Sequence, residues 1–406
     1  MLDTLIHKAS IPHYNHLMDV GVQNGSITYL SKAEERLPHA KQIMDADGRV
    51  LLPGLIEPHI HLDKAYLLDQ MNEDATTLDE AIQLTGDLKK GFTKDDIKQR
   101  SIKVLEKCIS YGVTNIRCHV EVDPIVGLKG MEVLLELKQQ YRDRIDLQLV
   151  TFPQEGIFQQ KGTAELLEES LIMGADVVGG IPYNDPNPIG HLDLVFDLAH
   201  RFDKALDFHV DFSDNPKQLA IKDIVSRTLT YGLEGRVAVG HLTSLGSVPQ
   251  EEAKQIAKDI AKAGIHVMTL PATDLFLNGR SDKERVRRGV TPVKLLLEEG
   301  ANVIVGTNNI QNPFTPFGTG DPLDVALLLA HVAQMGTLKD SETLLDMTTI
   351  HAAKALGIQS HGIALNNQAD LVLFDTKNTR NVLLERPKRL AIWKKGIQVN
   401  KTALGV

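Results

Sequence analysis

The chain has 406 residues, of which 42% are hydrophobic and 24% are charged, and its formal net charge is −9. This composition is typical of a globular protein larger than one ordinary domain, and an acidic balance without a basic stripe argues against nucleic acid as the main partner. No apolar run of about 18 residues suggests a membrane span, and the N-terminus lacks a secretion signal, so we expect a cytoplasmic protein with no membrane partner.

The two ends of the chain have the pattern of a small β domain. Residues 1–49 contain short alternating segments broken at Asn24-Gly25 and Asp47-Gly48, which are hairpin signals. The tail is also rich in strand-forming residues, but neither end has enough strands to be stable alone. We therefore expect residues 1–52 and 362–406 to form one small β-sandwich domain together.

Between these ends, β-branched runs alternate with amphipathic stretches, which is the pattern of repeated strand and helix units. The expected strands are residues 50–56, 113–120, 146–152, 175–181, 205–210, 237–240, 265–270 and 301–306. Eight parallel strands, each followed by a helix, form an α/β fold, the closed (β/α)₈ TIM barrel, here over residues 53–361. An open doubly wound sheet is the alternative, but no Gly-x-Gly-x-x-Gly motif follows the first strand.

Histidines collect at the C-terminal ends of the expected strands, where the loops of a barrel build active sites. They are His59, His61, His119, His209 and His241. Taken singly, each is more often a hydrogen-bonded structural histidine than a metal ligand. Their shared placement favours a site in which His59, His61 and His209 hold one divalent metal, zinc or iron. We expect His119 and His241 to line the pocket and to position water or substrate.

The motifs at these strand ends resemble those of the cytosine deaminase branch of the amidohydrolase superfamily, over nearly all of the chain. They are Pro53-Gly54-Leu55-Ile56-Glu57-Pro58-His59-Ile60-His61-Leu62-Asp63, His119-Val120, Phe152-Pro153-Gln154-Glu155-Gly156-Ile157, Gly174-Ala175-Asp176-Val177-Val178-Gly179, Asp207-Phe208-His209-Val210-Asp211, Gly240-His241-Leu242-Thr243-Ser244, Asn312-Pro313-Phe314, Gly318-Thr319 and Ala369-Asp370-Leu371-Val372. The resemblance implies the same three metal ligands, a contact between His241 and the attacking water, and a substrate-binding Gln154 that reads the amide edge of a heterocycle.

Two positions depart from the deaminase pattern. Family members carry a glutamate three residues after the histidine of strand 5 and an aspartate at the end of strand 8, where this chain has Phe212 and Asn308. Neither side chain accepts a proton near neutral pH, although Asn308 can offer a metal a neutral oxygen. We expect both residues to contact the substrate, and the loss of a proton carrier to cost about 10² to 10⁴ in rate. The apolar Phe212 also makes cytosine itself an unfavourable substrate.

Four carboxylates follow the strand-end histidines by two or four residues, and they would face the pocket if the strands continue that far. They are Asp63, Glu121, Asp123 and Asp211. Each is either a replacement proton carrier or a partner that holds an imidazole in one tautomer. We assign Asp211, with His241, as the catalytic candidate.

Other side chains are weaker candidates. Lys64 is interpreted as a solvated lysine, with Asp63 or a substrate carboxylate as alternative partners. Tyr183 and Phe276 follow expected strands, where they either stack on a flat ring or pack within loops. The two cysteines, Cys108 and Cys118, are expected to be buried as small apolar residues rather than joined in a disulfide or a metal cluster.

The sequence therefore predicts a metal-dependent hydrolase that cleaves a carbon–nitrogen bond of a small cyclic nitrogen compound, as in the deamination of cytosine. The alternative is a catalytically impaired homologue that binds a small heterocycle without efficient turnover. A small molecule is the expected partner in both cases, and both are compatible with a homo-oligomer.

Overall fold

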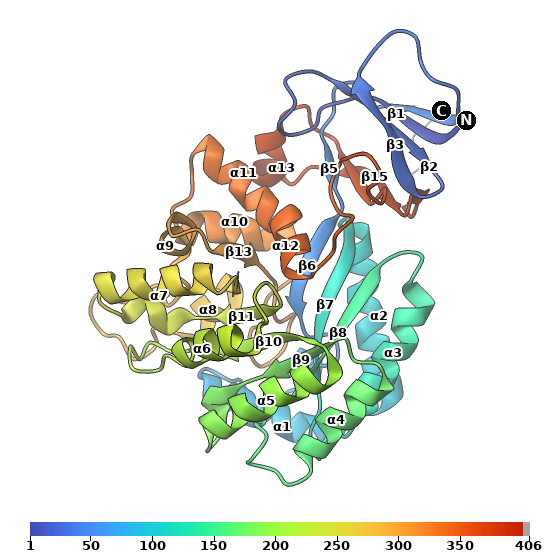
Figure 1. The fold of residues 1–406 in the computed structure, drawn as a ribbon. Helices are drawn as coiled ribbons and strands as arrows, with labels where there is room; N and C mark the ends of the chain where they lie inside the picture. Colours follow the sequence, from blue (N-terminus) through green and yellow to red (C-terminus); the bar gives the residue numbers. More distant parts are fainter. Residues whose placement is uncertain (401–406) are drawn as a thin grey trace.

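The computed structural model of the protein describes residues 1–400, which form a barrel with a small β domain beside one of its ends (Figure 1). The barrel strands are β6 (Leu55–Ile60), β7 (Val113–Glu121), β8 (Asp146–Phe152), β9 (Val177–Gly180), β10 (Ala205–Val210), β11 (Val237–His241), β12 (His266–Thr269) and β13 (Asn302–Val305). They are hydrogen-bonded in sequence order, and all neighbours are parallel. The expected (β/α)₈ barrel is confirmed.

The barrel closes where the chain leaves β13. The backbone N–H of Asn308 donates to the carbonyl oxygen of His59 at 2.8 Å, and the N–H of His61 donates to the carbonyl oxygen of Asn308 at 3.0 Å. These two hydrogen bonds join the end of β13 to the end of β6. The ring of strands is therefore sealed beside the two histidines of β6.

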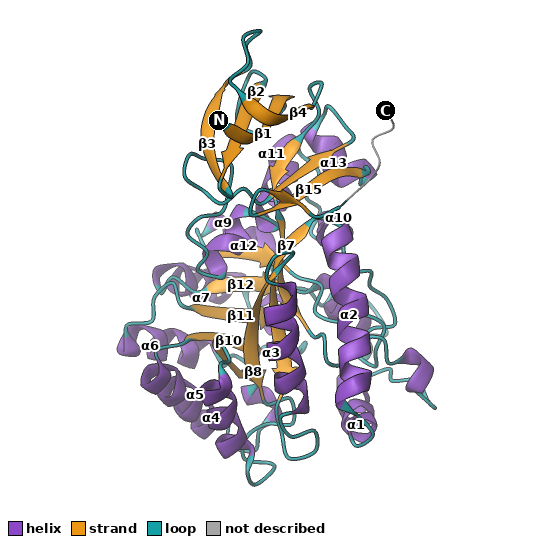
Figure 2. Ribbon diagram, turned by 90° about the vertical axis from the view of Figure 1, so that its right-hand side faces the viewer, coloured by secondary structure: helices purple, strands orange, loops and turns teal. Residues whose placement is uncertain are grey.

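Helices surround the barrel, and Figure 2 shows α2 and α3 running along its outside. They are α1 (Leu78–Lys89), α2 (Lys94–Ser110), α3 (Lys129–Tyr141), α4 (Thr163–Met173), α5 (Pro188–Phe202), α6 (Ile221–Tyr231), α7 (Gln250–Lys262), α8 (Pro271–Leu277), α9 (Val293–Glu298), α10 (Pro322–Val332), α11 (Leu338–Met347), α12 (Ile350–Ala355) and α13 (Thr379–Glu385). In α7 the buried positions are Ala253, Ile256, Ala257 and Ile260, a spacing that places them on one face of the helix. None of the helices in the described part of the chain is long and apolar enough to span a membrane.

The small domain consists of two four-stranded sheets with a shared hydrophobic core. One sheet contains β1 (Leu2–Ala9), β2 (Met18–Gln23), β3 (Ser26–Lys32) and β4 (Ala40–Asp45), and the other contains β5 (Leu51–Pro53), β14 (Leu371–Phe374), β15 (Arg389–Lys394) and β16 (Ile397–Gln398). Ile6 and Val20 of the first sheet share one buried cluster with Leu51, Leu371 and Trp393 of the second. The β-sandwich built from both ends is thus confirmed, and the division at residues 52–53 and 361–362 stays a prediction.

The expected strand 50–56 is wrong as a single barrel strand. Residues Leu51–Pro53 form β5, which pairs with β14 in the small domain, and only the segment from Leu55 onward enters the barrel. The chain passes from one sheet to the other at Gly54. An apolar run cannot reveal this division, because both halves are buried and hydrophobic.

We expect Gly54→Ala to destabilise the protein by about 1 to 3 kcal/mol, because a side chain at this junction would clash with its neighbours. A Cβ atom at Gly54 would lie 2.3 Å from Oγ1 of Thr114. Denaturant unfolding measures the effect. The matched control is Gly336→Ala, where a Cβ atom meets nothing within 4 Å. Equal unfolding midpoints for the two variants would contradict the prediction.

Candidate active site

Three imidazoles bring their Nε2 atoms together at the C-terminal ends of β6 and β10. Nε2 of His59 lies 3.1 Å from Nε2 of His209, and Nε2 of His61 lies 3.3 Å from the same atom. Burial, reinforced by nearby positive charge, lowers the pKa of all three rings well below the ordinary value. Neutral imidazole nitrogens that converge in this way have the geometry of a cation site.

Asn308 adds an oxygen beside this cluster. Its backbone has a left-handed φ of 63°, and its buried Oδ1 has no hydrogen-bond partner among residues 1–400. A buried polar atom without a partner is costly unless something else satisfies it. Three nitrogens with one neutral oxygen match the donor preferences of zinc and of ferrous iron. The residues present therefore fit a divalent metal.

His119 lies behind the cluster rather than in the pocket. Its ring centroid is 4.0 Å from that of His59, and its Nε2 is 3.1 Å from Oδ1 of Asp207. Asp207 also pairs with Arg117 at 3.0 Å. The expected substrate contact of His119 is not supported, because β7 continues two residues beyond it to Glu121 and leaves it inside the barrel. Asp207 had a sequence signal, since it precedes His209 by two residues on the same face of β10.

His241 does reach the pocket, and its orientation is held from two sides. Its Nδ1 lies 2.7 Å from Oδ1 of the buried Asp274 on α8, and the ring of Phe212 stacks on it at 3.9 Å with an interplanar angle of 14°. Sequence reasoning did not find Asp274. Its only signal was its position just after the expected seventh strand.

The cavity above the imidazole cluster is small and largely covered. Its lining is His61, Lys64, Leu78, Gln154, Tyr183, His209, Phe212, His241, Thr273, Asn308, Asn309 and Phe314. Its free volume of about 10 Å³ is close to the minimum that holds one water molecule. Phe212 and Phe314 belong to one apolar cluster with residues of α1, which covers the site, so these side chains must move to admit a ring.

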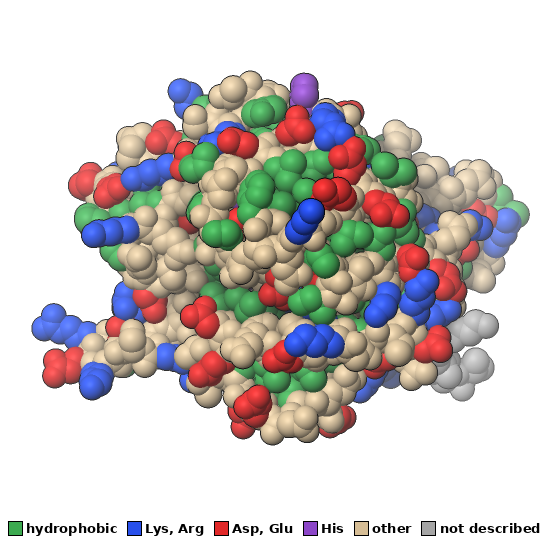
Figure 3. Space-filling model, turned by 90° about the horizontal axis from the view of Figure 1, so that it is seen from below, with side chains coloured by type: hydrophobic (Ala, Val, Ile, Leu, Met, Phe, Trp, Pro, Cys, Tyr) green, Lys and Arg blue, Asp and Glu red, His purple; other side chains and the backbone are tan. Residues whose placement is uncertain are grey.

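The outer surface on this side is apolar at its centre. Figure 3 views the molecule from the side opposite the small β domain and shows hydrophobic side chains gathered across the middle, with charged side chains around them. Tyr183 lines the cavity itself, whereas Phe276 packs at the edge of the apolar cluster that covers it.

Asp211 faces away from the imidazoles. Strand β10 ends at Val210, and Asp211 has a left-handed φ of 51°. Its carboxylate accepts hydrogen bonds from the backbone N–H groups of Ala220 at 2.8 Å and Ile221 at 3.1 Å, at the start of α6. The expected pocket-facing orientation required the strand to continue, and it does not. Burial raises the pKa of Asp211 to about 7.

Lys64 is buried rather than solvated, contrary to the interpretation made from sequence. Its Nζ donates to Oε1 of Glu121 and to Oε1 of Gln154, both at 2.8 Å. Burial opposes ionisation of Glu121, but the positive charges of Lys64 and Lys89 outweigh it and lower the pKa of Glu121 to about 2. Glu121 therefore serves an ion pair and is not a proton carrier. Both cysteines are free and buried, as expected.

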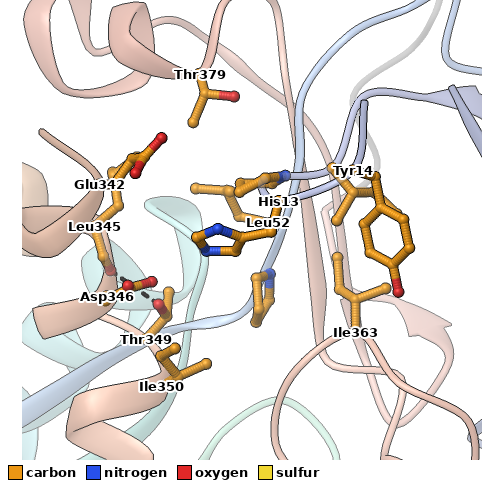
Figure 4. Close-up of a pocket in the computed structure, with 13 residues that line it drawn as sticks. His13, Tyr14, Leu52, Glu342, Leu345, Asp346, Thr349, Ile350, Ile363 and Thr379 are labelled. Atoms are coloured by element: carbon orange, nitrogen blue, oxygen red, sulfur yellow. Dashed lines mark hydrogen bonds between the residues drawn. The ribbon is translucent and has the colours of Figure 1, made fainter. Parts of the chain in front are cut away.

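A second cavity, of about 160 Å³, lies between the small domain and helices α11 and α12 (Figure 4). His13 of the small domain points across it toward Glu342 and Asp346 of α11, Tyr14 lies beside Ile363, and much of the lining is aliphatic. The metal-ligand groups found in the described part of the chain all lie elsewhere. Among the described residues, this second cavity therefore has no such group in its lining.

Comparison with known proteins gives one consistent result. A model of the amidohydrolase family matches residues 42–392. The chain is 29% identical over 405 residues to N-isopropylammelide isopropyl amidohydrolase of Pseudomonas sp. (strain ADP), covering 97% of this chain and 96% of that one. It is 27% identical over 360 residues to the pterin deaminase of Rhizobium rhizogenes, covering 88% and 82%. The crystal structure of 5-methylcytosine deaminase from Klebsiella pneumoniae with 5-fluorocytosine matches with a TM-score of 0.94 and 29% identity, covering 99% and 98%.

We expect the protein, after incubation with zinc and dialysis, to retain about one zinc ion per chain, as a site with three protein ligands does. His209→Ala should retain far less, because it removes the nitrogen that both short contacts share. Elemental analysis measures the zinc. His119→Gln is the control and should keep the metal, since its ring lies behind the cluster. Equal zinc in His209→Ala and the unmodified protein would contradict the assignment.

Proposed function

The chain belongs to the amidohydrolase family and is a hydrolase of carbon–nitrogen bonds other than peptide bonds, and from this premise we propose that it removes an amino or alkylamino group from a flat nitrogen heterocycle. The observation that carries the proposal is the convergence of three neutral imidazoles beside a pocket-facing His241. A zinc or ferrous ion held by His59, His61 and His209 would supply an electrophile that makes water nucleophilic near neutral pH. The relatives described above are named for pterin, ammelide and methylcytosine, all of which contain such rings.

His241 is the proposed carrier of protons. Asp274 accepts a hydrogen bond from the Nδ1–H group, which leaves the lone pair on Nε2 for the cavity. The imidazole can then take a proton from the attacking water and deliver it to the departing amine. Phe212 occupies the position of the family's glutamate and offers no proton site, so the same imidazole serves both transfers. Its stacking on His241 keeps the ring in one plane.

Asn308 sets the charge of the site. An aspartate at this position would carry a negative charge, whereas the amide of Asn308 is neutral. A metal held by three imidazoles and an amide would have no anionic ligand from the protein to offset its charge, and would therefore polarise water more strongly than one held with an aspartate. The missing anionic ligand would also weaken retention of the metal.

The proposal is tested by assaying release of ammonia or amine from a panel of aminopyrimidines, aminotriazines, N-alkylaminotriazines and pterins with zinc-loaded and iron-loaded protein. We expect turnover of at least one class, and its loss in His209→Ala, because that variant lacks the shared ligand. A protein that holds metal and binds panel members without releasing any amine would instead be the catalytically impaired homologue.

We expect Asp274→Asn to lower kcat by about 10² to 10⁴, the usual effect of losing an oriented base. The amide can donate to Nδ1 and so place the proton on Nε2, the wrong nitrogen for accepting one from water. Steady-state kinetics on the best panel substrate measures the change. The matched control is Asp19→Asn, which alters a buried Asp–His pair of 2.8 Å with His7 in the small domain. A similar fall in kcat in both variants would contradict the role of Asp274.

A further inference from the structure

We propose that Lys64 fixes the side-chain amide of Gln154 so that the cavity floor presents only N–H donors, and that the substrate is a heterocycle whose non-reacting edge carries only acceptors. The inference rests on the proposed function, because it concerns how the same site selects its ring. Lys64 and Gln154 both line the cavity, and they are 1% and 3% exposed.

The orientation of the Gln154 amide follows from the chemistry of the ammonium group. Nζ of Lys64 lies 2.8 Å from Oε1 of Gln154. An ammonium group has three N–H donors and no lone pair, so only the amide oxygen can occupy that position. Rotation of the amide by 180° would place two sets of N–H groups against each other in a buried space. The oxygen of Gln154 is therefore committed to Lys64.

The NH₂ group of Gln154 is left for the cavity. No residue in the described part of the chain accepts a hydrogen bond from its Nε2 through a contact recorded in the structure. Lys64 also donates a hydrogen bond to Glu121. Its Nζ lies 4.3 Å from the centroid of the Phe314 ring, which also lines the cavity. At the cavity floor the substrate therefore meets the amide NH₂ group of Gln154 beside the ammonium group of Lys64. A glutamine without a neighbouring lysine would offer the substrate both a donor and an acceptor.

The positive charge of Lys64 is offset by a network of two ammonium groups and three carboxylates, so the floor selects by hydrogen-bond direction rather than by a net positive charge. Glu121 lies between Lys64 and Lys89, and Lys89 also contacts Asp123 and Glu155 at 2.6 Å each. These carboxylates hold both ammonium groups in place. A neutral ring edge with carbonyl oxygens or nitrogen lone pairs is complementary to such a floor. A ring N–H turned toward it has no partner.

Two neutral probes separate these edges. Cytosine presents a carbonyl oxygen beside a ring N–H, and 4-amino-2-methoxypyrimidine presents an ether oxygen beside a ring nitrogen lone pair. Calorimetric titration of the zinc-loaded protein gives a Kd for each probe. We expect the methoxy compound to bind about tenfold more tightly than cytosine, because the N–H of cytosine is left unpaired.

Three variants test the part played by Lys64. Lys64→Met frees the amide to rotate, so the ratio of the two Kd values should fall toward one. Lys64→Arg keeps a donor-only partner and should preserve the preference. Gln154→Glu places an acceptor at the floor and should reverse the preference toward cytosine. The ratio cancels general effects on affinity, so a variant that merely disturbs the fold leaves it unchanged.

A preference for cytosine in the unmodified protein, or a ratio that Lys64→Met and Gln154→Glu both leave unchanged, overturns the inference. Failure of both probes to bind overturns it as well. If Lys64→Met does not fold, the comparison of Lys64→Arg with Gln154→Glu decides. If the Kd ratios are as expected but no amine is released, this inference stands and the proposed function fails. If amine is released but the variants leave the Kd ratio unchanged, the proposed function stands and this inference fails.

Discussion

The contact of two imidazole nitrogens with a third is the interaction on which the site depends. Nε2 of His209 lies within 3.3 Å of Nε2 in both His59 and His61. An imidazole nitrogen carries either one proton or one lone pair, so His209 cannot form a good hydrogen bond to both neighbours. A shared cation would satisfy all three nitrogens at once. The backbone hydrogen bonds between Asn308 and the two β6 histidines close the barrel directly beside this cluster, so the position of the site depends on that closure.

The carboxylates that support the site do not line the cavity but contact the side chains around it. Asp274 stands behind His241, Asp207 behind His119, and Glu121 behind Lys64. Each acts through a neighbouring side chain, which it orients or keeps in one ionisation state. The surface that meets a substrate consequently has imidazoles, amides, aromatic rings and the ammonium group of Lys64, but no carboxylate. This arrangement agrees with Phe212 and Asn308 at positions where the family has carboxylates.

The sequence predicted the repetitive parts of the molecule well and the local exceptions poorly. The bounds of β8 and β10 agree with expectation, because apolar residues alternate with other residues along each strand, as Leu206, Phe208 and Val210 do in β10. The orientation of Asp211 was unpredictable, since it depends on a left-handed backbone after the last strand residue. The burial of Lys64 depends on Glu121 and Gln154, which lie 57 and 90 residues away in the chain. Such pairings become visible only when the strands are placed side by side.

One sheet of the small domain combines strands from distant parts of the chain: β5 precedes the barrel, and β14, β15 and β16 follow it. Strand β5 pairs with β14, so its partner is synthesised only after all eight barrel strands. Until then β5 and the sheet that packs on it expose apolar surface and unpaired backbone groups, which are prone to association with other chains. Loss of β14 and β15 would therefore favour aggregation, because strands made after the barrel cover apolar surface of strands made before it.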